Sequence, residues 1–458
     1  MNIIQSKLAY FFKKQQTATK TKLRALVIPI FIETLLIMML GVVDTFMLSR
    51  FSDDSVAAVG VVNQIIMFTL LVFEVINIGT SVLCSQYIGA RQNDKVIQVV
   101  GVSLILNIVF GLVISSILYF AASPILFTMG LRDELLDLGV SYMEIVGAFA
   151  FFQAISLTIS ASLKSANKAI YPMMVTVVIN ILNIIGNYTL IFGKFGFPSL
   201  GVEGAAISTA FARGVAMIIL FVILLKKHIP SFPKEYFKPF PFSQLKNLLK
   251  VGVPSAGENM SYSLSQVVIT FFIAMIGTHA LATRTYVVNV VMFVYLFTIA
   301  MAQGGAICIG QFVGMQKNHA AFILGKYVMR LSVTVSLILS IIWACSSKLI
   351  FSWLTDNKQI ITMATFILLI EVFLEIGRAI NIYATNALRA AGDVLYPFYV
   401  GLIVQWSIAV GLSYFLGIYL GFGLVGMWCA FALDENIRGV IFVKRWNSLK
   451  WSQKSFVQ

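Results

Sequence analysis

Two acidic residues, Glu33 and Asp44, lie inside an apolar run that is long enough to cross a bilayer, VIPIFIETLLIMMLGVVDTF (residues 27–46). An acidic side chain in hydrocarbon costs about 2.5 kcal/mol or more, so such residues usually have a function. The two positions are eleven residues apart (44 minus 33), which is close to three helical turns. Both side chains therefore leave one helix face, about 16 Å apart along the axis. Such carboxylates are candidates for binding protons or cations.

A second set of charged residues lies in apolar runs of the C-terminal half: Glu371, Glu375, Arg378, Asp434, Glu435 and Arg438. The spacings from Glu375 to Arg378 and from Asp434 to Arg438 suit ion pairs within a helix. We therefore expect these two pairs to be structural. Glu371 lies one turn from Glu375 and outside the pairs, which makes it a candidate for titration or ion coupling.

The composition identifies the solvent around these residues. Of the 458 residues 59% are hydrophobic and 11% are charged, and the mean hydropathy is +0.91, which is typical of a polytopic membrane protein. The net charge of +14 comes from Lys and Arg gathered near the N-terminus, around residues 226–250 and near the C-terminus. This is the positive-inside pattern of a membrane protein rather than a nucleic-acid-binding surface.

Apolar runs of about 20 residues predict twelve membrane spans, beginning near residues 24, 56, 96, 136, 171, 202, 251, 280, 322, 361, 395 and 420. The predicted order is a cytoplasmic segment 1–23, an N-lobe 24–226 with six spans, a linker 227–250, a C-lobe 251–444 with six spans and a tail 445–458. An even number of spans places both termini and the linker on one side, and their basic character places that side in the cytoplasm of a cell (inner) membrane.

The two halves are copies of one unit, related by an offset of 225 positions. This offset pairs Pro29 with Pro254 and Glu33 with Glu258, and it pairs LKSANKAIYP (163–172) with LRAAGDVLYP (388–397) and RGV at 213 with RGV at 438. Six spans per copy give both halves one orientation, so we expect an all-α fold with a pseudo-two-fold axis along the membrane normal. Duplicated bundles of this kind are typical of transporters that rock one half against the other.

Glu33 and Glu258 each follow a helix proline by four residues. The predicted symmetry would place them opposite each other across the inner mouth of a cleft, where they would bind a cation or close a gate. The alternative is an architectural role, in which they accept hydrogen bonds from donors that the prolines free.

Other classes of site lack the residues that they require. The four Cys residues lie in apolar runs and the three His residues are scattered near loops, so we expect no metal site and no disulfide. The sequence has no catalytic constellation and no phosphate-binding glycine loop. We therefore expect no enzymatic activity, no cofactor, no nucleic-acid partner and no obligatory protein partner; the bilayer and small molecules are the expected partners.

Several stretches resemble the multidrug and toxic compound extrusion (MATE) family: VIPIFIETLL, GVVDTFMLSR, GTSVLCSQYIGA, GVPSAGENM, NALRAAGDVLYP and GLVGMWCAFALDENIRGV. The resemblance covers essentially the whole chain. It implies two six-helix lobes around a V-shaped cavity, and export of organic cations or other amphipathic compounds in exchange for sodium or protons.

The resemblance also implies roles for individual residues. Asp44 lies in the family-like VDT stretch, where the acid serves in coupling, and Asn183 and Asn187 match polar positions that line the same cavity. These three residues could hold sodium. The alternatives are that Asp44 reaches the outer interface to meet Arg50, and that the Asn residues hydrogen-bond between helices.

The C-lobe departs from the better-known sodium-coupled relatives. Their acid in the seventh helix lies where this chain has Tyr262, and their acid in the tenth helix aligns with Arg378, so their cation site is not carried over. A flippase for lipid-linked substrates remains an alternative function within the same superfamily. Such flippases usually line the cavity with several cationic residues, whereas the spans of the N-lobe offer mainly Arg213.

Overall fold

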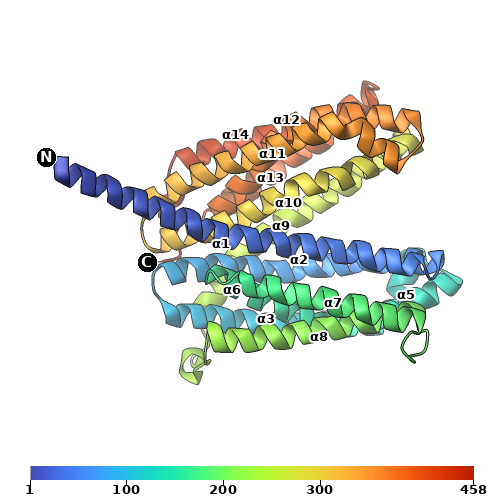
Figure 1. The fold of residues 1–458 in the computed structure, drawn as a ribbon, viewed down its shortest axis with the longest axis horizontal. Helices are drawn as coiled ribbons and strands as arrows, with labels where there is room; N and C mark the ends of the chain where they lie inside the picture. Colours follow the sequence, from blue (N-terminus) through green and yellow to red (C-terminus); the bar gives the residue numbers. More distant parts are fainter. Residues whose placement is uncertain (1, 458) are drawn as a thin grey trace. The chain divides into compact units, whose positions relative to one another are not determined.

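The computed structural model describes residues 2–457 as backbone and residues 18–457 with side chains. Met1, in the predicted segment 1–23, and Gln458, in the predicted tail 445–458, lie outside the described residues. Over the described residues the chain is helical, as Figure 1 shows, and the predicted all-α class is confirmed. The α-helices are α1 (Asn2–Ser49), α2 (Asp53–Gly89), α3 (Asn93–Phe120), α4 (Ala122–Thr128), α5 (Asp133–Ala148), α6 (Ala150–Ser165), α7 (Ile170–Phe192), α8 (Gly201–Lys227), α9 (Phe242–Ile276), α10 (Thr278–Gly314), α11 (Asn318–Leu354), α12 (Lys358–Ala390), α13 (Leu395–Val404) and α14 (Gly423–Asn447).

Four shorter elements complete the fold. The linker contains a 3₁₀ turn, η1 (Lys234–Phe237), and the tail contains another, η4 (Lys450–Gln453). Helix α13 continues as π-helix through η2 (Gln405–Leu412) and η3 (Tyr414–Tyr419), so these three elements form one span.

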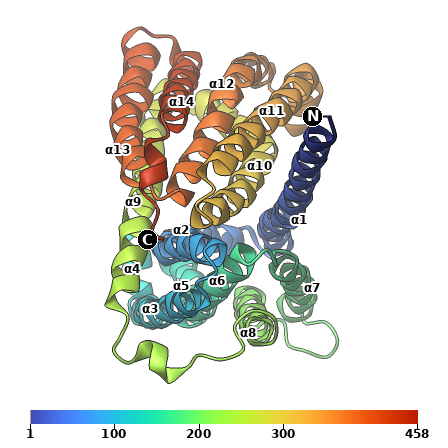
Figure 2. The ribbon, with the colours of Figure 1, turned by 90° about the vertical axis from the view of Figure 1, so that its left-hand side faces the viewer.

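The chain divides into two compact units, an N-unit (Met1–Gly252) and a C-unit (Val253–Gln458). The spans of the N-unit are α1, α2, α3, α5 with α6, α7 and α8, and those of the C-unit are α9, α10, α11, α12, α13 with its π-helical continuation, and α14. Figure 2 shows the helices of each unit end-on as a bundle. Helix α9 begins in the N-unit and continues into the C-unit.

Two spans do not stand out by hydropathy as single helices. Within the described residues ten helices are individually long and apolar enough to cross a membrane, and α5 with α6 forms an eleventh span that bends by 44° near Phe149. Helix α14 is the twelfth, and its buried Asp434, Glu435 and Arg438 lower its hydropathy. The predicted twelve spans are therefore present, with a break in the fourth.

Local signals explain where several helices begin and end. Ser52 caps α2, since its Oγ accepts a hydrogen bond from the Asp54 N–H at 3.2 Å. Asn357 caps α12 in the same way, and Gly193 ends α7 in the left-handed region with a φ of 64°. Pro29 and Pro254 lie inside α1 and α9, as is common in membrane helices, where neighbouring groups satisfy the freed carbonyls.

Small residues allow close helix contacts inside each unit. A Cβ on Gly204 in α8 would lie 2.6 Å from the Leu190 carbonyl carbon in α7, and a Cβ on Gly377 in α12 would lie 2.5 Å from the Asn436 nitrogen in α14. Glycine at such contacts lets helix backbones approach each other, as expected where packing rather than the hydrophobic effect holds helices together. Many large apolar side chains, such as Phe120 and Trp353, are exposed and would face lipid.

Candidate functional site

A row of polar side chains joins α1, α7 and α8 inside the N-unit. Asn187 Nδ2 donates to Asp44 Oδ1 at 2.7 Å and to Asn183 Oδ1 at 3.0 Å. Asn183 Nδ2 in turn donates to Thr209 Oγ1 at 3.2 Å. The three residues that the sequence proposes as an ion site are therefore in direct contact, with Thr209 as a fourth member. We call Asp44, Asn183, Asn187 and Thr209 the N-unit polar row.

The N-unit polar row is shielded and has spare acceptor capacity. Asn183 and Asn187 are almost fully buried, and Asp44 is half-buried. Within the described residues Asn187 Oδ1 has no hydrogen-bond partner, although both hydrogens of its amide are used. A carboxylate with a neighbouring amide oxygen is a donor set that suits either a hard cation or a proton.

Arg213 lies one helical turn beyond Thr209 on α8. Its guanidinium has charge interactions with Asp44 and with the buried Tyr142, whose hydroxyl also interacts with Thr209. No residue in the described part of the chain makes a hydrogen bond or an ion pair with the side chain of Arg213. The N-unit thus holds an arginine near the polar row that makes no direct bond to the acid of that row, Asp44.

Glu33 belongs to a separate cluster further along α1. Lys164 Nζ of α6 lies 2.9 Å from Glu33 Oε1, and Ser160 Oγ donates to the same oxygen at 3.4 Å. Glu33 is buried, and its Oε2 has no partner among the described residues. Glu33 and Asp44 share a helix but have different partners.

Glu258 has the equivalent partner in the C-unit. Arg389 Nη2 of α12 lies 2.6 Å from Glu258 Oε2 of α9. Lys164 and Arg389 are 225 positions apart, as are Glu33 and Glu258, so the repeat preserves a complete ion pair. The sequence prediction missed both basic partners. The aligned stretches LKSANKAIYP and LRAAGDVLYP contained the signal, because each has a basic residue at its second position.

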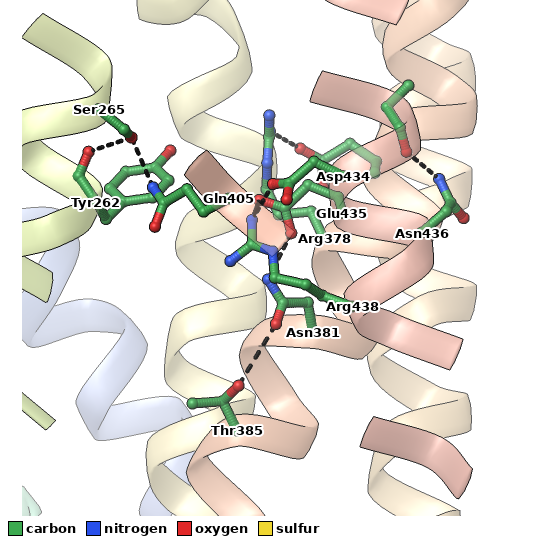
Figure 3. A network of polar contacts seen from close by, with 12 residues as sticks. Tyr262, Ser265, Arg378, Asn381, Thr385, Gln405, Asp434, Glu435, Asn436 and Arg438 are labelled. Carbon is green, nitrogen blue, oxygen red and sulfur yellow. Dashed lines mark hydrogen bonds and ion pairs between the residues drawn. The ribbon is translucent and has the colours of Figure 1, made fainter. Parts of the chain in front are cut away.

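The C-unit contains a larger ionic cluster, part of which Figure 3 shows, and we call it the C-unit ionic network. Arg378 Nη1 contacts Glu371 Oε1 at 2.7 Å and also contacts Glu375. Glu371 receives a further hydrogen bond from Trp428 Nε1, at 2.6 Å on Oε2. Glu371, which the spacing left outside the pairs, therefore has two direct partners.

Arg438 forms the second half of this network. It contacts Asp434 and, at 3.0 Å, Glu435 Oε1. Asn381 Nδ2 of α12 donates to Glu435 Oε2 at 2.6 Å and links the two helices, as Figure 3 shows. The structure thus contains both pairs that the spacing suggests, and each arginine has a second acid.

The C-unit ionic network has an excess of negative charge. Four acids, Glu371, Glu375, Asp434 and Glu435, surround Arg378 and Arg438. With every group ionised, four negative and two positive charges leave a formal charge of minus two. Two uncompensated charges in a buried site are costly, so this network favours the uptake of protons or cations.

Arg284 of α10 has simpler surroundings. Arg284 Nη2 donates to Gln266 Oε1 at 3.0 Å, and its Nη1 contacts Thr270, so it links α10 to α9. Among the residues that the structure describes, no three His, Cys, Asp or Glu side chains cluster as metal ligands.

Together, the twelve spans in two repeated units and the buried ionisable clusters define a polytopic membrane transporter. The chain belongs to the MatE family, whose model matches residues 29–189 and again residues 254–415. The two matches begin 225 positions apart, as the internal repeat does. The family consists of ion-coupled transporters of small molecules, so the chain is a transporter and not an enzyme.

Relatives support the same assignment, and solved structures show the same fold. The chain is 42% identical to an uncharacterised transporter, YisQ, of Bacillus subtilis, over 96% of this chain and 97% of that protein. It is 26% identical to a probable multidrug resistance protein, NorM, of Thermotoga maritima, over 97% and 96%. The Vibrio cholerae MATE transporter VcmN in the bent form has the same fold, with a TM-score of 0.88, 19% identity and coverage of 96% of this chain and 98% of that one. A MOP superfamily transporter from Pyrococcus furiosus gives a TM-score of 0.85. The predicted family and fold are thus confirmed.

Proposed function

We propose that this protein is a secondary active multidrug efflux transporter. It would export organic cations or other amphipathic compounds in exchange for sodium or protons, by rocker-switch alternation between its two units. The observation that carries the proposal is the contact of Asp44 with Asn187 inside an apolar helix bundle. A carboxylate there gains most from binding a positive ion, and it can bind only one ion at a time.

Competition for Asp44 provides a mechanism for exchange. A cationic substrate bound near the carboxylate and an entering proton or sodium ion would neutralise the same charge, so each would displace the other. Movement of the units between inward and outward access would then convert this competition into antiport. The excess negative charge of the C-unit ionic network supports a second position at which such an ion could be taken up.

The proposed location follows from the same family. The transporter would reside in the cell (inner) membrane with both termini and the linker in the cytoplasm. The flippase alternative remains less favoured, because the ionic clusters described above contain more acids than arginines and so suit cations better than a pyrophosphate.

Transport in proteoliposomes tests the proposal. The purified protein would be reconstituted with a fluorescent lipophilic cation, and sodium and pH gradients would be imposed separately. We expect one of the two gradients to drive uphill accumulation that stops when that gradient is dissipated. Transport that neither gradient drives, together with scrambling of a lipid-linked pyrophosphate, would support the flippase instead.

A further inference from the structure

Arg213 is a charged residue of the N-unit whose surroundings the coupling mechanism leaves unexplained. It lies at the thirteenth position of the 27-residue helix α8, near the middle of the span. A guanidinium stays charged at any accessible pH, and at such depth it requires an anionic or strongly polar partner. In the described part of the chain the only acid that interacts with it is Asp44, and at charge–charge range rather than by contact.

The internal repeat provides an arginine at the equivalent position of the C-unit, and that arginine has bonded acids. Arg213 corresponds to Arg438 at the offset of 225, and Arg438 is bonded to Asp434 and Glu435 of its own helix. The corresponding N-unit residues are Thr209 and Ala210 (434 and 435 minus 225). The N-unit therefore keeps the arginine but lacks both acids that bind it in the C-unit.

The guanidinium lies near the N-unit polar row and is not fully enclosed: it interacts with Asp44 and with Tyr142, which also interacts with Thr209. Arg213 is half-buried, and none of its nitrogens is among the enclosed atoms without a partner. Along α7 and α8, Asn187 to Asn183 and Thr209 to Arg213 are each one turn, so the backbone of Arg213 lies about 12 Å deeper than that of Asn187. The long side chain shortens this separation. An acid at one end and an arginine at the other therefore flank a single polar row.

We propose that Arg213 binds the anionic group of the substrate, and that the N-unit site selects zwitterionic amphipathic compounds. The cationic group of such a compound would lie against Asp44, and its carboxylate would form the charge-assisted fork with Arg213. This inference rests on the proposed function, because it assigns the substrate class of the same site. Organic cations without an anionic group would still bind at Asp44, but less tightly, because they offer Arg213 no partner.

A matched pair of dyes tests the inference. One is a xanthene dye with a free carboxylic acid, which is zwitterionic at neutral pH, and the other is its methyl ester, which is cationic but has the same rings. Equilibrium binding to the purified full-length protein in detergent would be measured by fluorescence polarisation, and gradient-driven transport would be measured in proteoliposomes. The variants are Arg213→Gln, Arg213→Lys and, as a control, Arg330→Gln on an exposed residue of α11.

We expect the parent to bind the acid more tightly than the ester. Arg213→Gln should weaken binding of the acid at least about tenfold, the effect of losing a charge-assisted pair, and should leave binding of the ester unchanged or stronger. The affinity of Arg213→Lys for the acid should lie between those of the parent and Arg213→Gln, because lysine keeps the charge but not the planar fork. Arg330→Gln should bind both dyes like the parent.

Two results would overturn the inference. The first is an unchanged ratio of acid to ester affinity in Arg213→Gln. The second is an equal loss of binding of both dyes in Arg213→Gln and Arg213→Lys, which would make Arg213 a structural residue. Failure of the proposed efflux function would give a different result. Binding of the acid dye would still depend on Arg213, but neither the sodium nor the pH gradient would drive transport.

Discussion

At the scale of single residues, Asp44 is the group on which the coupling proposal depends. Its carboxylate contacts Asn187 and has no cation in direct contact, whereas Glu33, Glu258 and the acids of the C-unit ionic network each contact a Lys or an Arg. An acid without a bonded cation inside the protein is the one most available to an exchanging ion. Asp44, rather than the other acids, is therefore the first residue to test.

Asp44→Asn should abolish gradient-driven transport while leaving expression near that of the parent. The amide keeps the size and hydrogen-bonding capacity of the side chain but removes the charge that binds the ion. We expect a loss of more than about tenfold in initial rate. Asp53→Asn, on an exposed residue that begins α2, is the matched control. If Asp44→Asn transports at the parent rate, Asp44 is an interfacial residue and Glu371 becomes the next candidate.

The Glu33–Lys164 pair should contribute mainly to stability. Lys164→Gln leaves Glu33 buried without its cation, and stranding a buried charge costs about 3 kcal/mol. The double variant Glu33→Gln/Lys164→Gln should recover most of that loss, because no charge is left unpaired. Thermal unfolding in detergent measures the stability of the single and the double variant. In the C-unit, Glu258→Gln/Arg389→Gln should likewise recover most of the loss caused by Arg389→Gln alone. An additive loss in the double variant would contradict an ion-pair role.

His228, at the C-terminal end of α8, should make stability depend on pH. Burial, and secondly the charge of Lys168, lower the pKa of His228 to about 4. The unfolded chain protonates this histidine below about pH 6.5, whereas the folded chain does so only near pH 4. Stability should therefore be full above pH 6.5 and should fall as the pH drops toward 4.

The melting temperature in detergent at about pH 7 and about pH 5 measures this effect. His228→Gln should make the melting temperature less dependent on pH, and His319→Gln, on an exposed residue, should not. A parent protein that becomes more stable on acidification in this range would show that other groups dominate.

At the scale of elements, close helix contacts hold the ionic clusters in place. Asp434, Glu435 and Arg438 on α14 lie beside α12 at the level where Gly377 lets the two backbones approach. Asn436 Nδ2 also donates to the Phe373 carbonyl at 3.2 Å across this contact. Separation of the two helices would therefore disturb the C-unit ionic network without removing a charge.

Gly377→Ala should lower the melting temperature by several degrees, since its Cβ would lie 2.5 Å from the Asn436 nitrogen and overpacking costs about 1–3 kcal/mol. Gly41→Ala in α1 is the control, because apart from its chain neighbours and its own helix backbone no atom lies within 4 Å of its added Cβ. Alanine is favoured over glycine in a helix by about 0.5–1 kcal/mol, so this control should be neutral or stabilising. Equal melting temperatures for the two variants would show that α12 and α14 tolerate separation.

At the scale of the whole molecule, the orientation in the membrane can be tested independently of transport. The basic linker around Pro233 is expected in the cytoplasm, and the turn at Asp53 and Asp54 is expected outside. In a background without Cys84, Cys308, Cys345 and Cys429, an impermeant thiol reagent should label Asp54→Cys in intact cells. Labelling of Pro233→Cys should require lysis, and labelling from outside would refute the six-plus-six topology.

The sequence alone determined the class of the protein and the order of its parts. Hydropathy depends on local composition, and the offset of 225 depends on duplication. Both can therefore be read from the sequence without knowledge of the packing. They identified twelve spans, the linker and the acids in apolar runs. The break within the fourth span was not visible, because an apolar run of the right length reads as one helix whether or not it bends.

The partners of the charged residues were decided only by the tertiary structure. Spacing within one helix suggested Glu375 with Arg378 and Asp434 with Arg438, because such pairs are local. The bonds of Glu33 to Lys164, Glu258 to Arg389 and Asp44 to Asn187 join residues on different helices that are 131 or more positions apart in sequence. Which helix faces meet depends on the packing of small residues such as Gly204 and Gly377, and no local pattern encodes it.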